Sequence, residues 1–108
     1  MPIDEWADSL IQYGNWCGPN WTAGQNQSSR DYRLAGGDFT DPCIDEIDCA
    51  CRDHDQDCSH DLGCSRSGDM QLITEMSEFR SSSWNPILSA RAQAIQYAVL
   101  AAMPFRER

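Results

Sequence analysis

A histidine beside an aspartate is the feature of this sequence most able to do chemistry. The pair is His54-Asp55, in the segment Cys51-Arg52-Asp53-His54-Asp55. On a helix, neighbouring residues point about 100° apart. The histidine could therefore face inward as a general base. The carboxylate could then hold a cation beside the histidine without pairing to it.

A second segment could supply more ligands for such a cation. It reads Tyr-Gly-Asn-Trp-Cys-Gly-Pro-Asn over residues 13–20. A loop of this composition can curl so that several backbone carbonyls converge. Carbonyl and carboxylate oxygens suit a hard cation, calcium above all. If Cys17 is bridged to Cys51, the loop lies one helical turn from His54 and Asp55.

Four helices are expected to position these residues, and they make the fold mainly α. The predicted ranges are about 3–13, 44–59, 69–80 and 86–103, the last beginning at Asn85-Pro86 and ending at Pro104. Ser81 to Ser83 is predicted to be a linker. Residues 14–42 show no sustained period, although 27–40 could hold a short strand. A loop this long needs an ion or disulfides to hold it.

Each predicted helix has an inward stripe at helical spacing. The expected inward residues are, in chain order, Trp6, Leu10 and Tyr13; Ile44, Ile47, Cys51, His54 and Cys58; Leu72, Met76 and Phe79; and Leu88, Ala92, Ile95, Val99 and Ala102.

Composition limits the partners that this chain can have. Its 108 residues are enough for one domain, and 17 acidic against 8 basic residues give a net charge of -9. We therefore expect no nucleic-acid partner, since phosphate binding needs clustered positive charge. The same balance argues against a basic patch that docks on strongly anionic membranes. No obligate protein partner is inferred.

The six cysteines favour disulfides and an oxidising compartment, and so a secreted or extracellular protein. The first residues, Met-Pro-Ile-Asp-Glu-Trp, lack the basic start and apolar stretch of a signal peptide. We expect a mature form with an added methionine, or a domain excised from a larger chain.

Taken together, the two motifs resemble the secreted phospholipase A2 family. The resemblance rests on Cys-x-x-His-Asp on a helix preceded by Tyr-Gly-x-x-Cys-Gly, and on the order of the helices. It implies a single domain over residues 1–108, with a calcium-binding loop and a central helix that carries the His-Asp pair. The implied activity is calcium-dependent hydrolysis of the sn-2 ester of glycerophospholipids, releasing a fatty acid and a lysophospholipid.

The resemblance also implies a role for particular residues. His54 would be the general base, and Asp69 would orient it. The Gly18 N–H would help to hold the oxyanion. Calcium would be bound by the Asp55 side chain and by the backbone carbonyls of Trp16, Gly18 and Asn20. Trp6 and Leu10 would line the acyl channel.

The chain departs from the family pattern at several positions. Asn20-Trp21 stands where many members have Gly-Gly, and Cys58 replaces a frequent tyrosine. The cysteines before the histidine are spaced as Cys49-Ala50-Cys51, and the gap from His54 to Asp69 is short.

Cys17–Cys51 is taken as the first disulfide. If the second helix forms, Cys51 and Cys58 lie roughly 10 Å apart along it, beyond bridging reach, and so do Cys49 and Cys58. Two arrangements remain open for the other four cysteines: Cys43–Cys49 with Cys58–Cys64, or Cys43–Cys58 with Cys49–Cys64. We favour the first, which needs Cys43 to lie off the helix.

Several alternatives compete with this interpretation. The scaffold could be a non-catalytic calcium- or lipid-binding or toxin module, or a structural module with no site. Zinc could use Cys49, Cys51, His54 and Cys58, although Cys49 points away from the other three. Asp41, Asp45, Asp53 and Asp57 are expected to form a solvated face, with His60 at the surface.

Three tryptophans could contact lipid. Trp16, Trp21 and Trp84 suit either a lipid surface or packing beneath the loop. The expected partner is phospholipid at a membrane or micelle surface. Without lysine, zwitterionic or dispersed lipid is expected rather than anionic bilayers.

Overall fold

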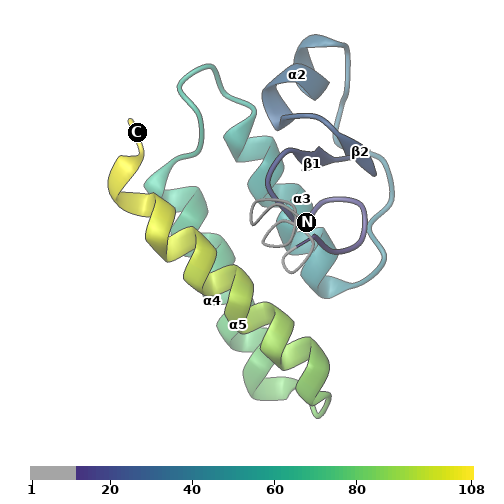
Figure 1. The fold of residues 1–108 in the computed structure, drawn as a ribbon, viewed down its shortest axis with the longest axis vertical. Coiled ribbons are helices and arrows are strands. Elements are labelled where there is room, and N and C mark those ends of the chain that lie inside the picture. The colour runs from purple at the N-terminus through teal and green to yellow at the C-terminus, as the bar shows by residue number, and fades with distance from the viewer. Residues whose placement is uncertain (1–11) are drawn as a thin grey trace, which may run out of the picture.

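The computed structural model describes residues 12–108 (Figure 1). The predicted first helix, with Trp6 and Leu10, lies almost entirely outside them; Gln12 and Tyr13 are not helical. The elements in chain order are β1 (Trp21–Thr22), β2 (Gln25–Asn26), α2 (Ser29–Leu34), α3 (Glu46–Cys58), α4 (Arg66–Ser82), α5 (Pro86–Ala102) and the 3-10 helix η1 (Met103–Phe105). The domain is thus mainly α-helical, as predicted.

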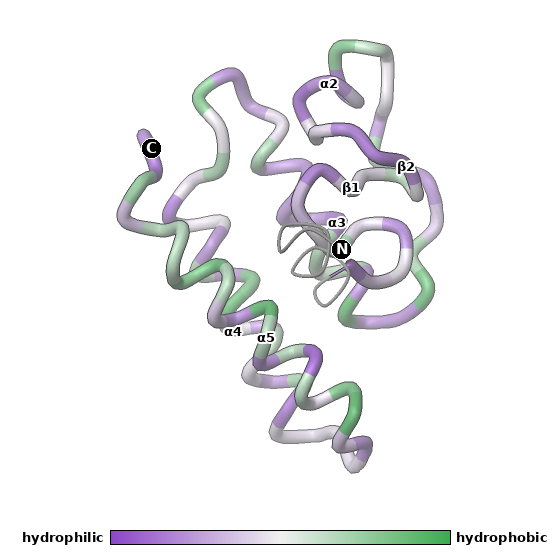
Figure 2. Tube along the Cα trace, in the orientation of Figure 1, coloured by the Kyte–Doolittle hydropathy of each residue, from purple (hydrophilic) through white to green (hydrophobic). Residues whose placement is uncertain are grey.

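Helices α4 and α5 form a long hairpin that packs along one side of α3 (Figure 1). The side chain of Asn85 caps α5 by accepting hydrogen bonds from the backbone N–H of Ile87 and Leu88, and Pro86 opens the first turn. Hydrophobic positions recur along both helices (Figure 2). The buried ones are Leu72, Met76, Ala92, Ile95 and Val99. The predicted stripes of these helices therefore form the core with α3.

Helix α3 begins later than expected. Asp45 caps it, since its carboxylate accepts the Asp48 N–H. Ile44 lies before the helix and is 62% exposed, so its predicted place on the inward face is wrong. Ile47 and Cys51 are buried as predicted. Because the Asp45 cap starts α3 at Glu46, the inward face that leads to His54 begins at Ile47 rather than at Ile44.

Helix α4 is longer than predicted at both ends. The Ser65 hydroxyl accepts the Gly68 N–H and starts the helix before Asp69. At the other end, Ser81 and Ser82 are helical, so only Ser83 belongs to the predicted linker. Their hydroxyls donate to the Glu78 carbonyl one turn back, which lets serines remain within the helix.

The stretch 27–40, which could have held a short strand, contains a helix instead. The strands are the antiparallel β1 and β2, and Ser29–Leu34 is the helix α2. Ser28 caps α2 by accepting the Asp31 N–H. The pattern Ser-x-x-Asp over residues 28–31 is a helix-start signal that predicts this helix from the sequence.

Three disulfides connect all six cysteines. They are Cys17–Cys51, Cys43–Cys49 and Cys58–Cys64, which confirms the favoured arrangement. Cys43 lies before α3, as that arrangement requires. The predicted zinc alternative fails, because its three cysteine sulfurs are all in disulfide bonds. Within residues 12–108, no helix has both the length and the apolar character needed to cross a membrane.

The buried carboxylate of Asp48 holds the loop against α3. It accepts the backbone N–H groups of Asn15, Trp16 and Ile44 at 2.9–3.1 Å. Gly14 makes this approach possible: its φ is +59°, and a Cβ there would lie 2.4 Å from the Asp48 carboxyl carbon. Asp48 therefore has a structural role: its carboxylate binds the loop backbone and is not exposed to solvent.

Trp16 is fully buried and packs against Tyr32 and Phe39, with ring centroids 5.8 Å away in each case. Of the two roles considered for the tryptophans, Trp16 therefore serves packing beneath the loop. The Trp21 indole N–H donates to the Gly14 carbonyl, whereas Trp84 is 91% exposed.

Gly14→Ala should destabilise the fold by at least about 2 kcal/mol, because the added methyl group displaces the buried Asp48 carboxylate from its N–H donors. Gly36→Ala is the matched control: its φ is also positive, at +98°, but nothing lies within 4 Å of the added atom. Urea unfolding measures both. Equal losses would contradict the role given to Asp48.

Candidate functional site

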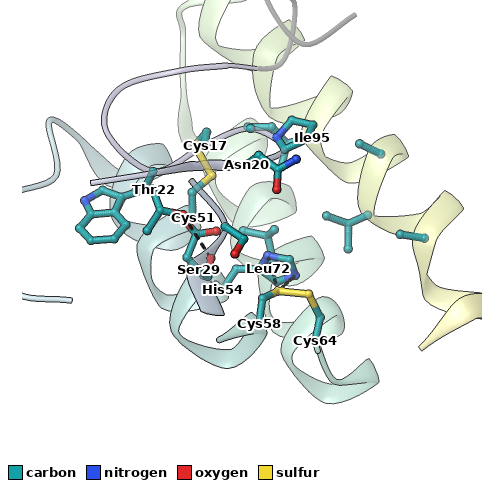
Figure 3. A pocket seen from close by; sticks show the side chains of 18 of the residues that line it. Cys17, Asn20, Thr22, Ser29, Cys51, His54, Cys58, Cys64, Leu72 and Ile95 are labelled. Carbon is teal, nitrogen blue, oxygen red and sulfur yellow. Dashed lines mark hydrogen bonds between the residues drawn. A yellow bond between two sulfur atoms is a disulfide. The ribbon is translucent and has the colours of Figure 1, made fainter. Parts of the chain in front are cut away.

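All of the predicted site residues except Asp69, which lies behind His54, line one cavity of about 460 Å³ between α3, α5 and the loop (Figure 3). Its polar lining includes His54, Asp55 and Asn20. Its apolar wall is formed by Leu72, Ile95, Ala98, Val99 and Ala102. The cavity thus places a polar cluster beside an apolar wall.

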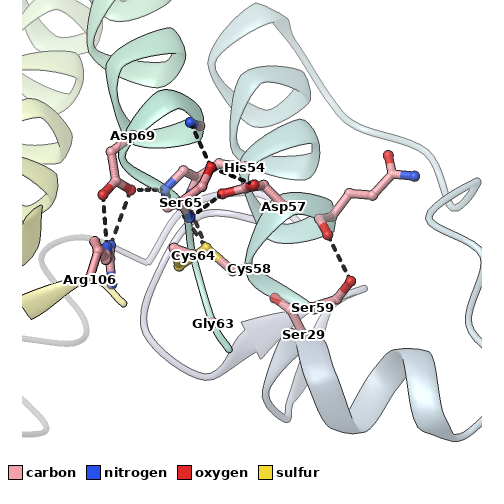
Figure 4. The surroundings of a disulfide bond; sticks show 12 residues. Ser29, His54, Asp57, Cys58, Ser59, Gly63, Cys64, Ser65, Asp69 and Arg106 are labelled. Atoms are coloured by element: carbon pink, nitrogen blue, oxygen red, sulfur yellow. Dashed lines mark hydrogen bonds and ion pairs between the residues drawn. A yellow bond between two sulfur atoms is a disulfide. The ribbon is translucent and has the colours of Figure 1, made fainter. Parts of the chain in front are cut away.

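His54 is paired with Asp69. Its Nε2 lies 2.7 Å from Asp69 Oδ1, with the aspartate side chain fully buried and the histidine side chain 13% exposed (Figure 4). The two residues can pair although only a short stretch of sequence separates them. His54 is one turn before the end of α3, Asp69 is in the first turn of α4, and Cys58–Cys64 ties the two helix ends together.

This pairing fixes which histidine nitrogen is basic. Arg106 forms an ion pair with Asp69, from Nε to Oδ2 at 2.7 Å. A carboxylate in such a pair only accepts hydrogen bonds, so the Nε2 of His54 must carry the proton. Nδ1 is then the nitrogen with a free lone pair. It lies 3.6 Å from the Cys58 sulfur, a weak partner.

Asp55 is the most poorly compensated carboxylate of the cavity. Its Oδ2 is buried and has no hydrogen-bond partner among residues 12–108. Burial raises the pKa of Asp55 well above its usual value, and the negative charge of Asp48 raises it further, while the Ser29 and Thr22 hydroxyls act weakly in the opposite direction. Such a group is stabilised by a positive charge placed against it.

The loop offers oxygens on the same side. Trp16, Gly18 and Asn20 all line the cavity. Within residues 12–108, the Trp16 and Gly18 carbonyls and the Gly18 N–H have no hydrogen-bond partner, whereas the Asn20 carbonyl accepts the Gln27 N–H at 2.9 Å. The first two carbonyls are therefore better placed as ligands than the third.

Asn20 has a left-handed backbone conformation. Its φ is +50°, and asparagine tolerates this region better than most residues. Its side chain points into the cavity (Figure 3). Asparagine at this position is thus compatible with the loop conformation and adds a polar group to the site.

This donor set fits a hard cation such as calcium. It combines a buried carboxylate oxygen that lacks a partner with carbonyl oxygens, and it contains no free thiolate. Ligand atoms of His54, Cys58 and Cys64 also lie within 4.8 Å of one another. Both sulfurs are in one disulfide, however, so they are not available as thiolate ligands.

Two aspartates expected on a solvated face have internal roles instead. Asp45 caps α3 and accepts the Tyr13 hydroxyl. Asp57 accepts the Ser65 N–H and hydroxyl at 2.8 Å. Asp41 and Asp53 are exposed as predicted, and His60 is at the surface, accepting the Leu62 N–H.

Arg106 was not predicted as part of the site. It lies beyond the helix stop at Pro104, where no periodicity relates it to α3 or α4.

Comparisons with known protein families, curated proteins and solved structures found no match for this chain.

Asp55→Asn should flatten part of the pH dependence of stability in metal-free protein. Because burial raises the folded-state pKa of Asp55 above the unfolded value, its contribution is fully present below about pH 4 and is lost as pH rises through the folded pKa. The loss of melting temperature between pH 4 and pH 8, measured in chelator, should therefore be smaller in Asp55→Asn.

Asp53→Asn, exposed on the same helix, is the control and should follow the wild type. A variant at residue 55 whose profile is parallel to that of the wild type would show that the carboxylate is well solvated.

Proposed function

We propose that this protein is a calcium-dependent phospholipase A2 that hydrolyses the sn-2 ester of glycerophospholipids. The observation that carries the proposal is the placement of two groups at one cavity. His54, whose Nε2 is held by Asp69, and Asp55, whose Oδ2 has no hydrogen-bond partner among residues 12–108, both line this cavity. A base and a vacant anionic ligand are what metal-assisted ester hydrolysis needs.

The chain's own residues carry the proton transfers. His54 Nδ1 takes a proton from a water molecule, and the water oxygen attacks the ester carbonyl carbon. Asp69 keeps Nε2 protonated and stabilises the imidazolium that forms. When the tetrahedral intermediate collapses, the bond to the sn-2 oxygen breaks and His54 returns the proton to that oxygen. The products are a fatty acid and a lysophospholipid.

The developing oxyanion needs a donor that is already in place. The Gly18 N–H, which has no partner within residues 12–108, would serve. Asp55 with the Trp16 and Gly18 carbonyls would hold calcium, and Asn20 would contribute less. Bound calcium would supply positive charge for the ester carbonyl oxygen and the lipid phosphate.

The apolar wall suits an acyl chain. Leu72, Ile95 and Val99 face the cavity from two helices and are themselves buried. The net charge of -9 favours zwitterionic or dispersed lipid over anionic bilayers. Three disulfides agree with secretion into an oxidising compartment.

Wild-type protein in millimolar calcium should release only the sn-2 fatty acid from a phosphatidylcholine with two different acyl chains. Chelator should abolish release. His54→Gln should lower the rate by at least about 100-fold, since general-base catalysis contributes that much. Chromatography of the released acids gives both the rate and the position of cleavage.

His60→Gln is the matched control, because it removes the only other histidine, which is exposed. It should keep the wild-type rate. Release of the sn-1 chain, or equal activity in chelator, would contradict the proposed reaction.

Calcium should raise the melting temperature of the wild type and leave that of Asp55→Asn unchanged. A dissociation constant of about 0.1–1 mM is expected for one carboxylate with carbonyls. At 100 times that constant, binding stabilises the folded state by about 2.7 kcal/mol. Magnesium at equal concentration controls for ionic strength, and Asp53→Asn should keep the calcium shift. A calcium shift without hydrolysis would favour the non-catalytic binding module.

A further inference from the structure

We propose that Arg106 is a positioning residue, which holds the Asp69 carboxylate in the orientation that presents Oδ1 to His54. The inference rests on the proposed function for its effect on rate. Its structural part can be tested without any activity.

Arg106 binds the Asp69 carboxylate through two hydrogen bonds. Its Nε donates to Asp69 Oδ2 at 2.7 Å and its Nη2 donates to Oδ1 at 3.1 Å (Figure 4). These two bonds occupy both oxygens of one carboxylate from one planar guanidinium. Such a fork fixes the plane of the carboxylate, which a single hydrogen bond does not. Rotation of Asp69 away from His54 would break both.

Asp69 depends on this partner. Its side chain is fully buried, and among residues 12–108 its carboxylate forms hydrogen bonds only with His54 and Arg106. The imidazole reaches Oδ1 alone. Without Arg106, Oδ2 would be buried with no donor, and the negative charge would face a neutral ring. A buried charge without compensation is unfavourable, so the carboxylate would turn away from this orientation.

The chain after α5 is held in place for this contact. The 3-10 helix η1 turns the chain at Pro104, and the Arg66 N–H then donates to the Arg108 carbonyl at 2.9 Å. Arg108 donates in turn to the carbonyls of Asp57 and Gly63. Residues 103–108 are therefore fastened to the α3–α4 connection, the segment that also sets the distance between His54 and Asp69.

A double-mutant cycle on kcat separates positioning from an independent role. Arg106→Gln should lower kcat by about 10–100-fold, the range found for residues that orient functional histidines, with KM changed less than twofold. In an Asp69→Asn background, the same substitution should change kcat less than threefold, because the group on which it acts is already lost. Arg106→Lys keeps the charge but not the fork and should recover only part of the loss.

Arg80→Gln is the matched control, since it removes another side-chain contact between α4 and α5, to Gln96, away from Asp69. It should leave kcat unchanged. Rates are expressed per folded molecule, from near-UV circular dichroism. If the Arg106 and Asp69 effects multiply, or if KM rises while kcat is kept, Arg106 acts on substrate and the proposal fails.

Nitrogen NMR of the imidazoles tests the inference even if no lipid is hydrolysed. The wild type should show His54 as one neutral tautomer, protonated at Nε2. Arg106→Gln should show a mixture of tautomers, and His60 should not change. A single Nε2–H tautomer in Arg106→Gln overturns the proposal whatever the activity. If Arg106→Gln does not fold, the same spectrum of Arg106→Lys decides, with loss of the single tautomer expected.

Discussion

The free energy of removing negative charge from water governs how the site is built. Among the described residues, Asp48 and Asp69 are buried, and Asp55 has a buried Oδ2. Asp48 is compensated by backbone N–H groups, which fix the loop to α3. Asp69 is compensated by Arg106 and His54, which fix the orientation of the imidazole. Asp55 Oδ2 has no hydrogen-bond partner in the part of the chain that the structure describes. The contacts of Asp48 and Asp69 fix the loop and the imidazole on either side of Asp55. The uncompensated Asp55 carboxylate therefore faces the same cavity as the basic nitrogen of His54.

Short covalent connections make this arrangement possible in a chain with a modest core. Cys17–Cys51 joins the loop to the middle of α3, and Cys58–Cys64 closes the turn between α3 and α4. Each of these two disulfides has one cysteine, Cys51 or Cys58, three or four residues from His54. The distances that matter for chemistry are therefore set by local connections rather than by the packing of distant side chains. This explains how His54 and Asp69 can pair across so short a stretch of sequence.

The helices α3, α4 and α5 could be predicted because their signals are periodic or local, and the same geometry narrowed the disulfides to two arrangements, of which the favoured one is present. The stripes of α3, α4 and α5, the Asn85-Pro86 start and the reach of a disulfide all follow from helix geometry. The boundaries were less predictable, since Ser65 and Asp45 each cap a helix by a side-chain bond that spacing does not show. Arg106 could not be found, because its partner depends on how η1 turns the chain. Helix α2 was missed although its Ser-x-x-Asp start was present.

The eight basic residues are all arginine, and some of them join separate segments of the fold. Arg33 donates to the Ser59 carbonyl and to Asp61, which ties α2 to the end of α3. Arg108 joins two carbonyls and a carboxylate on the α3–α4 connection. A guanidinium can do this because it offers several donors in a fixed plane, whereas an ammonium group is a point charge. The positive charge of these arginines is directed toward neighbouring segments of the chain. The outer surface is left with an excess of carboxylates, and this is the physical basis for expecting a preference for lipid without net charge.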